Sequence, residues 1–267
     1  MSKKPKIIAI LIAYNAAKTL KSFYQELPKN LFDEIILVDD ASEDGTFNIA
    51  QNLGIRSFQN KINLGYGGNL KKALNIALSL GAEIIVDIHP DGEYKPDSIP
   101  SAIESVKKGA DLVLGNRFFN ARYNLKRSGM FVWKIFPILF LNYISNKILK
   151  TGVSDLHQGF RVYTKGLLKK INFEENSNNY LFSFELIAQA VFIKANIQEV
   201  PVITKYSGKK RGAKLTSSIN YSLGTFKVLF MFLLAKNGLR SKIFQKPTHN
   251  LLKNGILPIE QYGKHNS

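Results

Sequence analysis

Short apolar segments alternate with helical segments through the first 120 residues, and this alternation constrains the fold more than any other feature. Apolar runs typical of buried strands lie at residues 6–13, 34–38, 55–59, 84–88 and 112–114. The segments between them have helical periodicity; for example, Leu70, Leu74 and Leu78 share one face of a helix expected over residues 70–80. The pattern predicts an α/β fold in which helices flank both faces of a mostly parallel sheet.

Polar clusters follow four of these strands. They are Tyr14-Asn15, Asp39-Asp40, the turn from His89 to Glu93, and Asn116-Arg117. The carboxyl ends of parallel strands meet at one edge of a sheet, and α/β enzymes bind their ligands there. We therefore expect these side chains to converge on a single site.

The turn after the fourth strand carries His89, Asp91 and Glu93 in alternation. In extended backbone these three side chains lie on one side. Carboxylate oxygens with one imidazole suit Mg²⁺ or Mn²⁺ better than a structural zinc. The alternative interpretation is a polar turn that caps the next segment, which begins near Pro96.

The pair Asp39-Asp40 follows a strand at a place where a carboxylate can accept hydrogen bonds from a nucleobase or a ribose. The alternative is helix capping, which Ser42 or Asp44 could also provide. The glycine-rich turn at 63–69 lacks the third glycine of a dinucleotide fingerprint and follows the third strand, which disfavours a Rossmann dehydrogenase. A phosphate-binding P-loop motif is also absent from the sequence.

The formal net charge of +17 comes entirely from residues 121–267, because residues 1–120 hold equal numbers of basic and acidic side chains. An anionic membrane surface, a phosphorylated substrate or nucleic acid could explain this asymmetry, and so could a generally basic proteome. No recognised nucleic-acid-binding motif accompanies the charge, so we do not expect nucleic acid as a partner. The chain has no cysteine, which excludes disulfides and thiolate metal sites.

Two apolar stretches, residues 129–149 and 223–235, stand out in the second half. A membrane span needs about 20 mostly apolar residues, and a charge or an amide interrupts both stretches before that length. We therefore expect no spanning helix, but helices that lie on an anionic membrane, or alternatively core helices. The flanking basic residues are Lys126, Arg127, Lys134, Lys147, Lys227, Lys236, Arg240 and Lys242.

Six motifs follow one another in order: AYN at 13–15, VDDASEDGT at 38–46, NLGYGG at 63–68, DGEYKP at 91–96, ADLVLGNR at 110–117 and SDLHQGFRVY at 154–163. Together they resemble the family 2 glycosyltransferases of the GT-A fold, whose core is a Rossmann-like, mostly parallel sheet. The resemblance is strongest to the branch that includes dolichyl-phosphate mannose synthase and bacterial polyprenyl-phosphate glycosyltransferases. It covers roughly residues 7–206.

This resemblance implies an inverting, metal-dependent transfer of a hexose from a UDP- or GDP-sugar to a polyprenyl phosphate of the undecaprenyl or dolichyl type. The metal motif Asp-x-Asp-x-Gln of these synthases falls on His89, Asp91 and Glu93, which would hold Mg²⁺ or Mn²⁺ although two of the three residue types differ. The residues that would bind the donor nucleotide are Ala13, Tyr14, Asn15, Asp39 or Asp40, Gly68 and His89.

The catalytic residues implied by the resemblance are Asp91, Arg117, Asp155 and Arg161. Arg117 and Arg161 match positions that bind donor or acceptor phosphate. Asp155 matches an acid that would act as base if the acceptor is a saccharide hydroxyl in surface-polysaccharide assembly, which is the alternative function. A lipid phosphate is already ionised at pH 7 and needs no base, so catalysis would then rest on metal, arginines and positioning.

Other basic residues, at Lys205, Lys209, Lys210 and Arg211, could hold such a phosphate beside a membrane. His157 and Glu185 are lesser candidates, the latter to orient Arg161 or to pair with a lysine. We expect one GT-A domain in which residues 1–120 bind the nucleotide sugar, residues 121–235 bind the acceptor near the membrane, and residues 236–267 form a tail. The expected location is cytoplasmic, at the inner face of the cell membrane.

Overall fold

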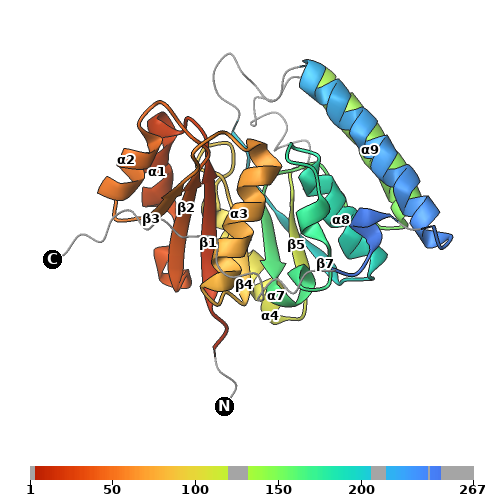
Figure 1. The fold of residues 1–267 in the computed structure, drawn as a ribbon, viewed down its shortest axis with the longest axis horizontal. Helices are drawn as coiled ribbons and strands as arrows, with labels where there is room; N and C mark the ends of the chain where they lie inside the picture. The colour runs from red at the N-terminus through yellow and green to blue at the C-terminus, as the bar shows by residue number, and fades with distance from the viewer. Residues whose placement is uncertain (1–3, 120–131, 206–214, 240, 248–267) are drawn as a thin grey trace.

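The structure is a computed structural model and describes residues 4–119, 132–205, 215–239 and 241–247. A seven-stranded sheet with the order β3-β2-β1-β4-β6-β5-β7 forms its centre (Figure 1). All neighbouring pairs are parallel except those of β6, which runs antiparallel to β4 and β5. The strands are β1 (Ile7–Ala13), β2 (Glu34–Asp39), β3 (Arg56–Gln59), β4 (Ile84–Asp87), β5 (Leu112–Asn116), β6 (Arg161–Thr164) and β7 (Ile197–Pro201).

Helices cover both faces of this sheet, and the central strands are buried on both sides. In β1, Ile8 and Ile10 belong to one apolar core and Ile7 and Leu11 to the other, as the alternation of side chains along a strand requires. The helices are α1 (Ala17–Glu26), α2 (Thr46–Asn52), α3 (Gly65–Ser79), α4 (Ile99–Lys107), α6 (Val132–Leu149), α7 (Lys165–Leu168), α8 (Phe182–Phe192) and α9 (Leu215–Lys236). Short 3₁₀ turns are η1 (Lys29–Leu31), η2 (Pro96–Ser98), η3 (Phe173–Glu175) and η4 (Lys242–Phe244). The mostly parallel α/β fold predicted from the sequence is confirmed.

Two elements differ from the sequence prediction. Arg161–Thr164 forms β6 in the middle of the sheet, a strand that the apolar pattern did not predict. A strand of four residues is too short to show a clear alternation of apolar and polar side chains in the sequence. The helix α3 begins at Gly65, five residues earlier than predicted, because the glycines form its first turn.

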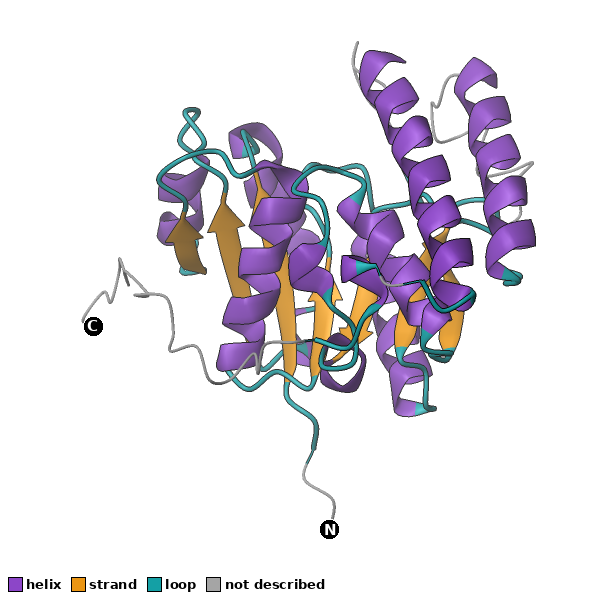
Figure 2. Ribbon diagram, turned by 45° about the vertical axis from the view of Figure 1, so that its right-hand side comes forward, coloured by secondary structure: helices purple, strands orange, loops and turns teal. Residues whose placement is uncertain are grey.

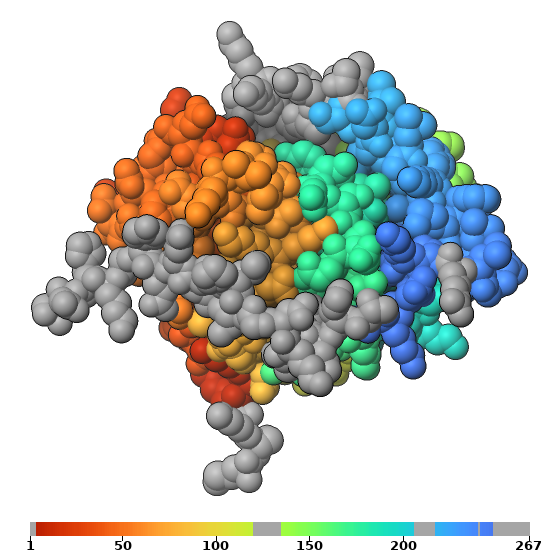
Figure 3. Space-filling model, viewed as in Figure 1, coloured from red at the N-terminus to blue at the C-terminus, as the bar shows by residue number. Residues whose placement is uncertain are grey.

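The helices α6 and α9 pack together and extend beyond the carboxyl edge of the sheet (Figure 2). In the space-filling view, α9 and η4 form one flank of the molecule beside α8 (Figure 3). Within α9, Ser217–Lys236 is 20 residues long with a mean hydropathy of 1.4, and by length and composition it could cross a membrane. This corrects the prediction that the chain holds no such stretch, because the apolar run continues in helical conformation through the serines and glycine before Phe226.

Candidate active site

The loops after β1 and β2 are joined to each other by hydrogen bonds. Asn15 adopts the left-handed conformation with φ of 52°, which asparagine tolerates better than most residues. Its backbone N–H donates to Ser42 Oγ at 2.8 Å, and its side-chain Oδ1 accepts from the amide of Glu43 at 3.2 Å. Ala13 is buried, whereas Tyr14 is 56% exposed at the edge of the sheet. Tyr14 therefore offers an accessible ring where a nucleoside is expected.

Asp39 and Asp40 are both buried and both engaged within the protein. Asp39 Oδ2 accepts from the Ser42 amide and from Gln59 Nε2, each at 3.0 Å. Asp40 accepts from the amides of Leu64 at 2.8 Å and Gly65 at 3.0 Å, so it caps the first turn of α3. Ser42 Oγ also donates to Asp39 Oδ1, so both carboxylates have structural partners within the protein.

Gly68 packs against protein backbone. The amides of Gly67 and Gly68 donate to the carbonyl of Asn178 at 2.8 and 3.2 Å. A Cβ on Gly67 would clash with the Ser177 carbonyl oxygen. These glycines serve close packing of α3 on the loop before α8, so the prediction that Gly68 contacts the donor is not supported by its surroundings.

His89 turns inward from the end of β4. Its Nε2 lies 3.4 Å from Oδ1 of the fully buried Asp87, whose Oδ2 accepts from Tyr163 Oη at 3.1 Å. Burial opposes protonation of His89, but the hydrogen bond and charge of Asp87, with the charge of Asp91, raise its pKa above the usual 6.5.

Asp91 lies on the exposed part of the same turn, and its Oδ1 accepts from the amide of Glu93 at 2.8 Å. Contrary to the prediction, His89, Asp91 and Glu93 do not form a three-ligand cluster, and the described residues contain no such His, Asp or Glu group. The reason is the inward rotation of His89 toward Asp87. A magnesium or manganese ion held by one or two carboxylates and by substrate phosphates still fits this turn, because such ions commonly use few protein ligands.

Arg161, at the start of β6, is almost completely buried. Its guanidinium donates to the carbonyls of Gln158 and Gly159 and lies 3.5 Å from Tyr66 Oη. Tyr66 also accepts from Ser183 Oγ at 3.1 Å. Burial raises the pKa of Tyr66 to about 12, so its hydroxyl stays neutral at physiological pH. Sequence reasoning missed Tyr66, although it stands within the quoted NLGYGG motif.

Arg117 and Asp155 form a buried, bidentate ion pair. Arg117 Nε lies 2.7 Å from Asp155 Oδ2 and Nη2 lies 2.8 Å from Oδ1, and the Arg117 amide also donates to Oδ2. A further bond joins Nη2 to the His157 carbonyl at 2.9 Å. Both carboxylate oxygens are therefore occupied, which does not fit the predicted role of Asp155 as a base. The same pairing turns the Arg117 fork toward Asp155.

The Asp155 loop is held from two helices. From α6, Asn142 accepts from the Leu156 amide at 3.0 Å and donates to the Ser154 carbonyl at 2.8 Å. From α9, Tyr221 Oη lies 2.9 Å from His157 Nδ1. The basic loop that includes Lys209, Lys210 and Arg211 lies outside the described residues.

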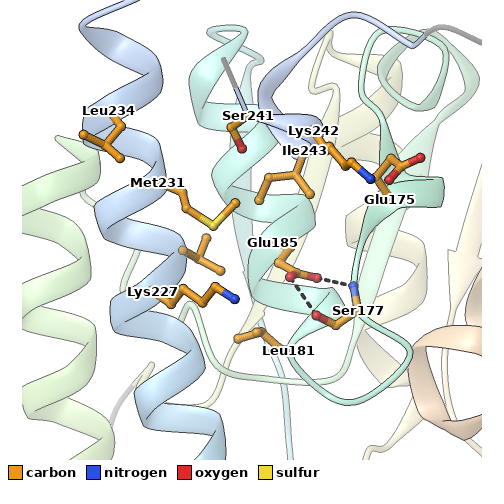
Figure 4. Close-up of a pocket in the computed structure, with 11 residues that line it drawn as sticks. Glu175, Ser177, Leu181, Glu185, Lys227, Met231, Leu234, Ser241, Lys242 and Ile243 are labelled. Carbon is orange, nitrogen blue, oxygen red and sulfur yellow. Dashed lines mark hydrogen bonds between the residues drawn. The ribbon is translucent and has the colours of Figure 1, made fainter. Parts of the chain in front are cut away.

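Glu185 does not contact Arg161. Its carboxylate accepts from the Ser177 amide at 2.6 Å and from Ser177 Oγ at 2.8 Å, as the dashed lines in Figure 4 show. Behind it lies a pocket of about 440 Å³ between α8, α9 and η4, away from the turn after β4. Burial raises the pKa of Glu185 above its usual value, against these hydrogen bonds. Glu185 therefore anchors the loop that precedes α8.

A mostly parallel sheet with polar loops at its carboxyl edge is the architecture of nucleotide-binding α/β enzymes. Residues 8–172 match the sequence model described as Glycosyl transferase family 2. The match spans more than half of the chain, and the protein belongs to this family of glycosyltransferases.

Individual relatives agree with this assignment. The chain is 29% identical over 252 residues to UDP-N-acetylglucosamine--dolichyl-phosphate N-acetylglucosaminyltransferase of Methanococcus voltae, covering 87% of this chain and 97% of the relative. It is 26% identical over 202 residues to polyprenol monophosphomannose synthase of Mycolicibacterium smegmatis, covering 73% and 74%. Glucosyl-3-phosphoglycerate synthase from Mycobacterium tuberculosis, solved with UDP, shares the fold with a TM-score of 0.66 at 18% identity, covering 89% of this chain and 82% of that one.

Proposed function

We propose that this protein transfers a hexose, with inversion, from a UDP- or GDP-sugar to a polyprenyl phosphate at a membrane surface. The names of two relatives support the choice of acceptor, since one acts on dolichyl phosphate and the other makes a polyprenol monophosphomannose. Residues 1–120 would bind the donor and residues 121–235 the acceptor.

The ion pair of Arg117 with Asp155 is the observation that carries this proposal. A saccharide hydroxyl must lose a proton as it attacks, and Asp155 was the expected base for that reaction. Arg117 occupies both of its oxygens. A lipid phosphate attacks as an anion and needs no base, so the occupied carboxylate is compatible with it.

Catalysis then depends on positioning the acceptor phosphate against the anomeric carbon and on neutralising the charge of the leaving diphosphate. An oxygen of the acceptor phosphate forms a bond to the anomeric carbon, and the bond from that carbon to the nucleoside diphosphate breaks on the opposite face. When bound, Mg²⁺ or Mn²⁺ supplies positive charge that neutralises the leaving diphosphate. Asp91 is the carboxylate best placed to hold the ion, with Glu93 beside it.

The paired helices α6 and α9 present an apolar face that fits a membrane surface. Large exposed side chains along it are Phe136, Leu139, Phe140, Tyr143, Ile219, Leu223, Phe226, Phe230 and Leu233. Lys147 and Lys236 on the same helices complement anionic lipid headgroups. We propose that α9 lies along this surface together with α6, which would make the enzyme a peripheral one.

The test is a transfer assay with anionic vesicles that contain undecaprenyl phosphate, MnCl₂, and radiolabelled UDP-N-acetylglucosamine, UDP-glucose or GDP-mannose. We expect label from one donor to enter the organic phase after extraction. Asp91→Asn should lower this transfer by at least about a hundredfold if its carboxylate holds the ion. Transfer only to soluble oligosaccharides would support the hydroxyl acceptor instead, and no transfer from any donor would contradict the proposal.

A further inference from the structure

The loop before α8 is fixed on several sides. Glu185 holds the amide and hydroxyl of Ser177. The carbonyl of Asn178 accepts from two amides in the first turn of α3, and its Oδ1 accepts from Lys71 Nζ at 2.9 Å. Asn179 Oδ1 accepts from the amide of Leu181 at 2.8 Å. A loop with this many bonds presents its remaining side chain, Tyr180, in a defined position.

Tyr180 is 61% exposed, although an aromatic ring of its size gains free energy from burial. One face of it packs on Tyr66, with ring centroids 5.0 Å apart at 33°. Tyr66 in turn packs edge-on against His89, with centroids 5.4 Å apart. A ladder of three rings therefore rises from the turn after β4 to the surface. Partial burial raises the pKa of Tyr180, and the charges of Glu93 and Asp91 add to this effect, in agreement with its place above that turn.

We propose that Tyr180 is the stacking platform for the transferred hexose and so a specificity-determining residue. This inference rests on the proposed function. The C–H face of a pyranose packs on an aromatic ring, while the ring's other face here is supported by Tyr66. The support makes the platform rigid before the donor binds, which lowers the ordering cost of binding.

The order of groups in the donor favours the hexose over the other parts of the substrates. The nucleoside is expected at the loops after β1 and β2, where Tyr14 is exposed, and the diphosphate at Asp91 after β4. The hexose is joined to the far phosphate, so it continues past Asp91. Tyr180 is the exposed ring that the ladder places beside this turn.

The experiment compares binding of a nucleotide sugar with binding of its own nucleoside diphosphate, by calorimetry with MnCl₂. The probes are UDP-N-acetylglucosamine, UDP-glucose and GDP-mannose against UDP and GDP. We expect Tyr180→Ala to weaken binding of the nucleotide sugar by about three- to tenfold and to leave binding of the nucleoside diphosphate unchanged. Tyr180→Phe keeps the ring and should bind both like the wild type.

Melting temperature and the KM for undecaprenyl phosphate serve as further readouts, and both should stay unchanged in Tyr180→Ala. If Tyr180→Ala weakens binding of the nucleotide sugar and of the nucleoside diphosphate equally, or changes only the KM for the acceptor, Tyr180 is not the stacking platform. If the wild type binds no nucleotide sugar, the proposed function fails and this inference fails with it. If the wild type binds nucleotide sugar and transfers the hexose, and Tyr180→Ala binds and transfers equally well, only the inference about Tyr180 fails.

Discussion

Tyr221 of α9 holds the ring of His157 through a 2.9 Å contact between its hydroxyl and Nδ1. The same imidazole stacks on Phe184 of α8, with ring centroids 5.2 Å apart. The backbone carbonyl of His157 accepts from Arg117. Helix α9, which carries exposed apolar side chains, is thereby connected through Tyr221 and His157 to the buried Arg117–Asp155 ion pair.

The first prediction concerns this connection. Tyr221→Phe removes one hydroxyl and should lower kcat for transfer by about three- to tenfold, because one hydrogen bond that positions the Asp155 loop is lost. Donor KM should not change. In a His157→Phe background, which keeps the stacked ring, the Tyr221 substitution should have no further effect, since the bond is already absent.

Tyr24→Phe on α1 is the matched control for Tyr221→Phe and should retain full activity. Additive effects of the Tyr221 and His157 substitutions in steady-state kinetics would contradict the connection.

The second prediction concerns the ion pair. Asp155→Asn leaves Arg117 buried without its counter-charge and should lower the free energy of unfolding by about 3–5 kcal/mol. Urea denaturation measures this change. An activity loss in Asp155→Asn with unchanged stability would point to a direct chemical role for the carboxylate.

The third prediction is a pH dependence of stability. Burial lowers the pKa of His157 to about 4. An unfolded histidine titrates near 6.5, so between these values the unfolded state binds a proton that the folded state does not, and stability falls as pH falls. From pH 7 to pH 5, the His157 imidazole should lower the free energy of unfolding by about 2 kcal/mol.

Urea denaturation of the wild type and of His157→Phe at both pH values measures this contribution. On acidification from pH 7 to pH 5, the free energy of unfolding of His157→Phe should fall by about 2 kcal/mol less than that of the wild type. His89 acts in the opposite sense, since its pKa is raised, and its stabilisation is fully present below about 6.5 and lost as pH rises through the folded pKa. Because His89 is common to both proteins, its effect cancels in the comparison, and equal acid losses would contradict the assignment for His157.

The fourth prediction concerns the membrane face. Replacing Phe136 and Phe230 by serine removes two exposed rings from α6 and α9, and should weaken cosedimentation with anionic vesicles by at least about tenfold, given about 1.5–3 kcal/mol for each buried ring. Melting temperature should stay constant, since both rings are exposed. Ile203→Ser, at an exposed apolar residue that belongs to neither helix, is the control. Unchanged cosedimentation of the double variant would exclude this face as the contact.

The sequence determined the order of strands and helices from β1 to β5 and the polar ends of these strands. The apolar run at Ile7–Ala13 is buried on both faces, and such a run can only be a central strand once helices alternate with it. The ordered motifs led to the correct family. These features depend on short segments and on the order in which the segments follow one another, so periodicity and motif order reveal them.

Tertiary structure alone decided which side chains pair. Asp155 is 38 residues from Arg117, and only the antiparallel insertion of β6 beside β5 brings their loops together. His89 shares its alternation with Asp91 in the sequence, but Asp87 draws it inward and away from a ligand set. A buried charge takes the partner that its folded surroundings bring nearest, because leaving it unpaired costs several kcal/mol. That choice depends on distances across the sheet, which residue spacing does not encode.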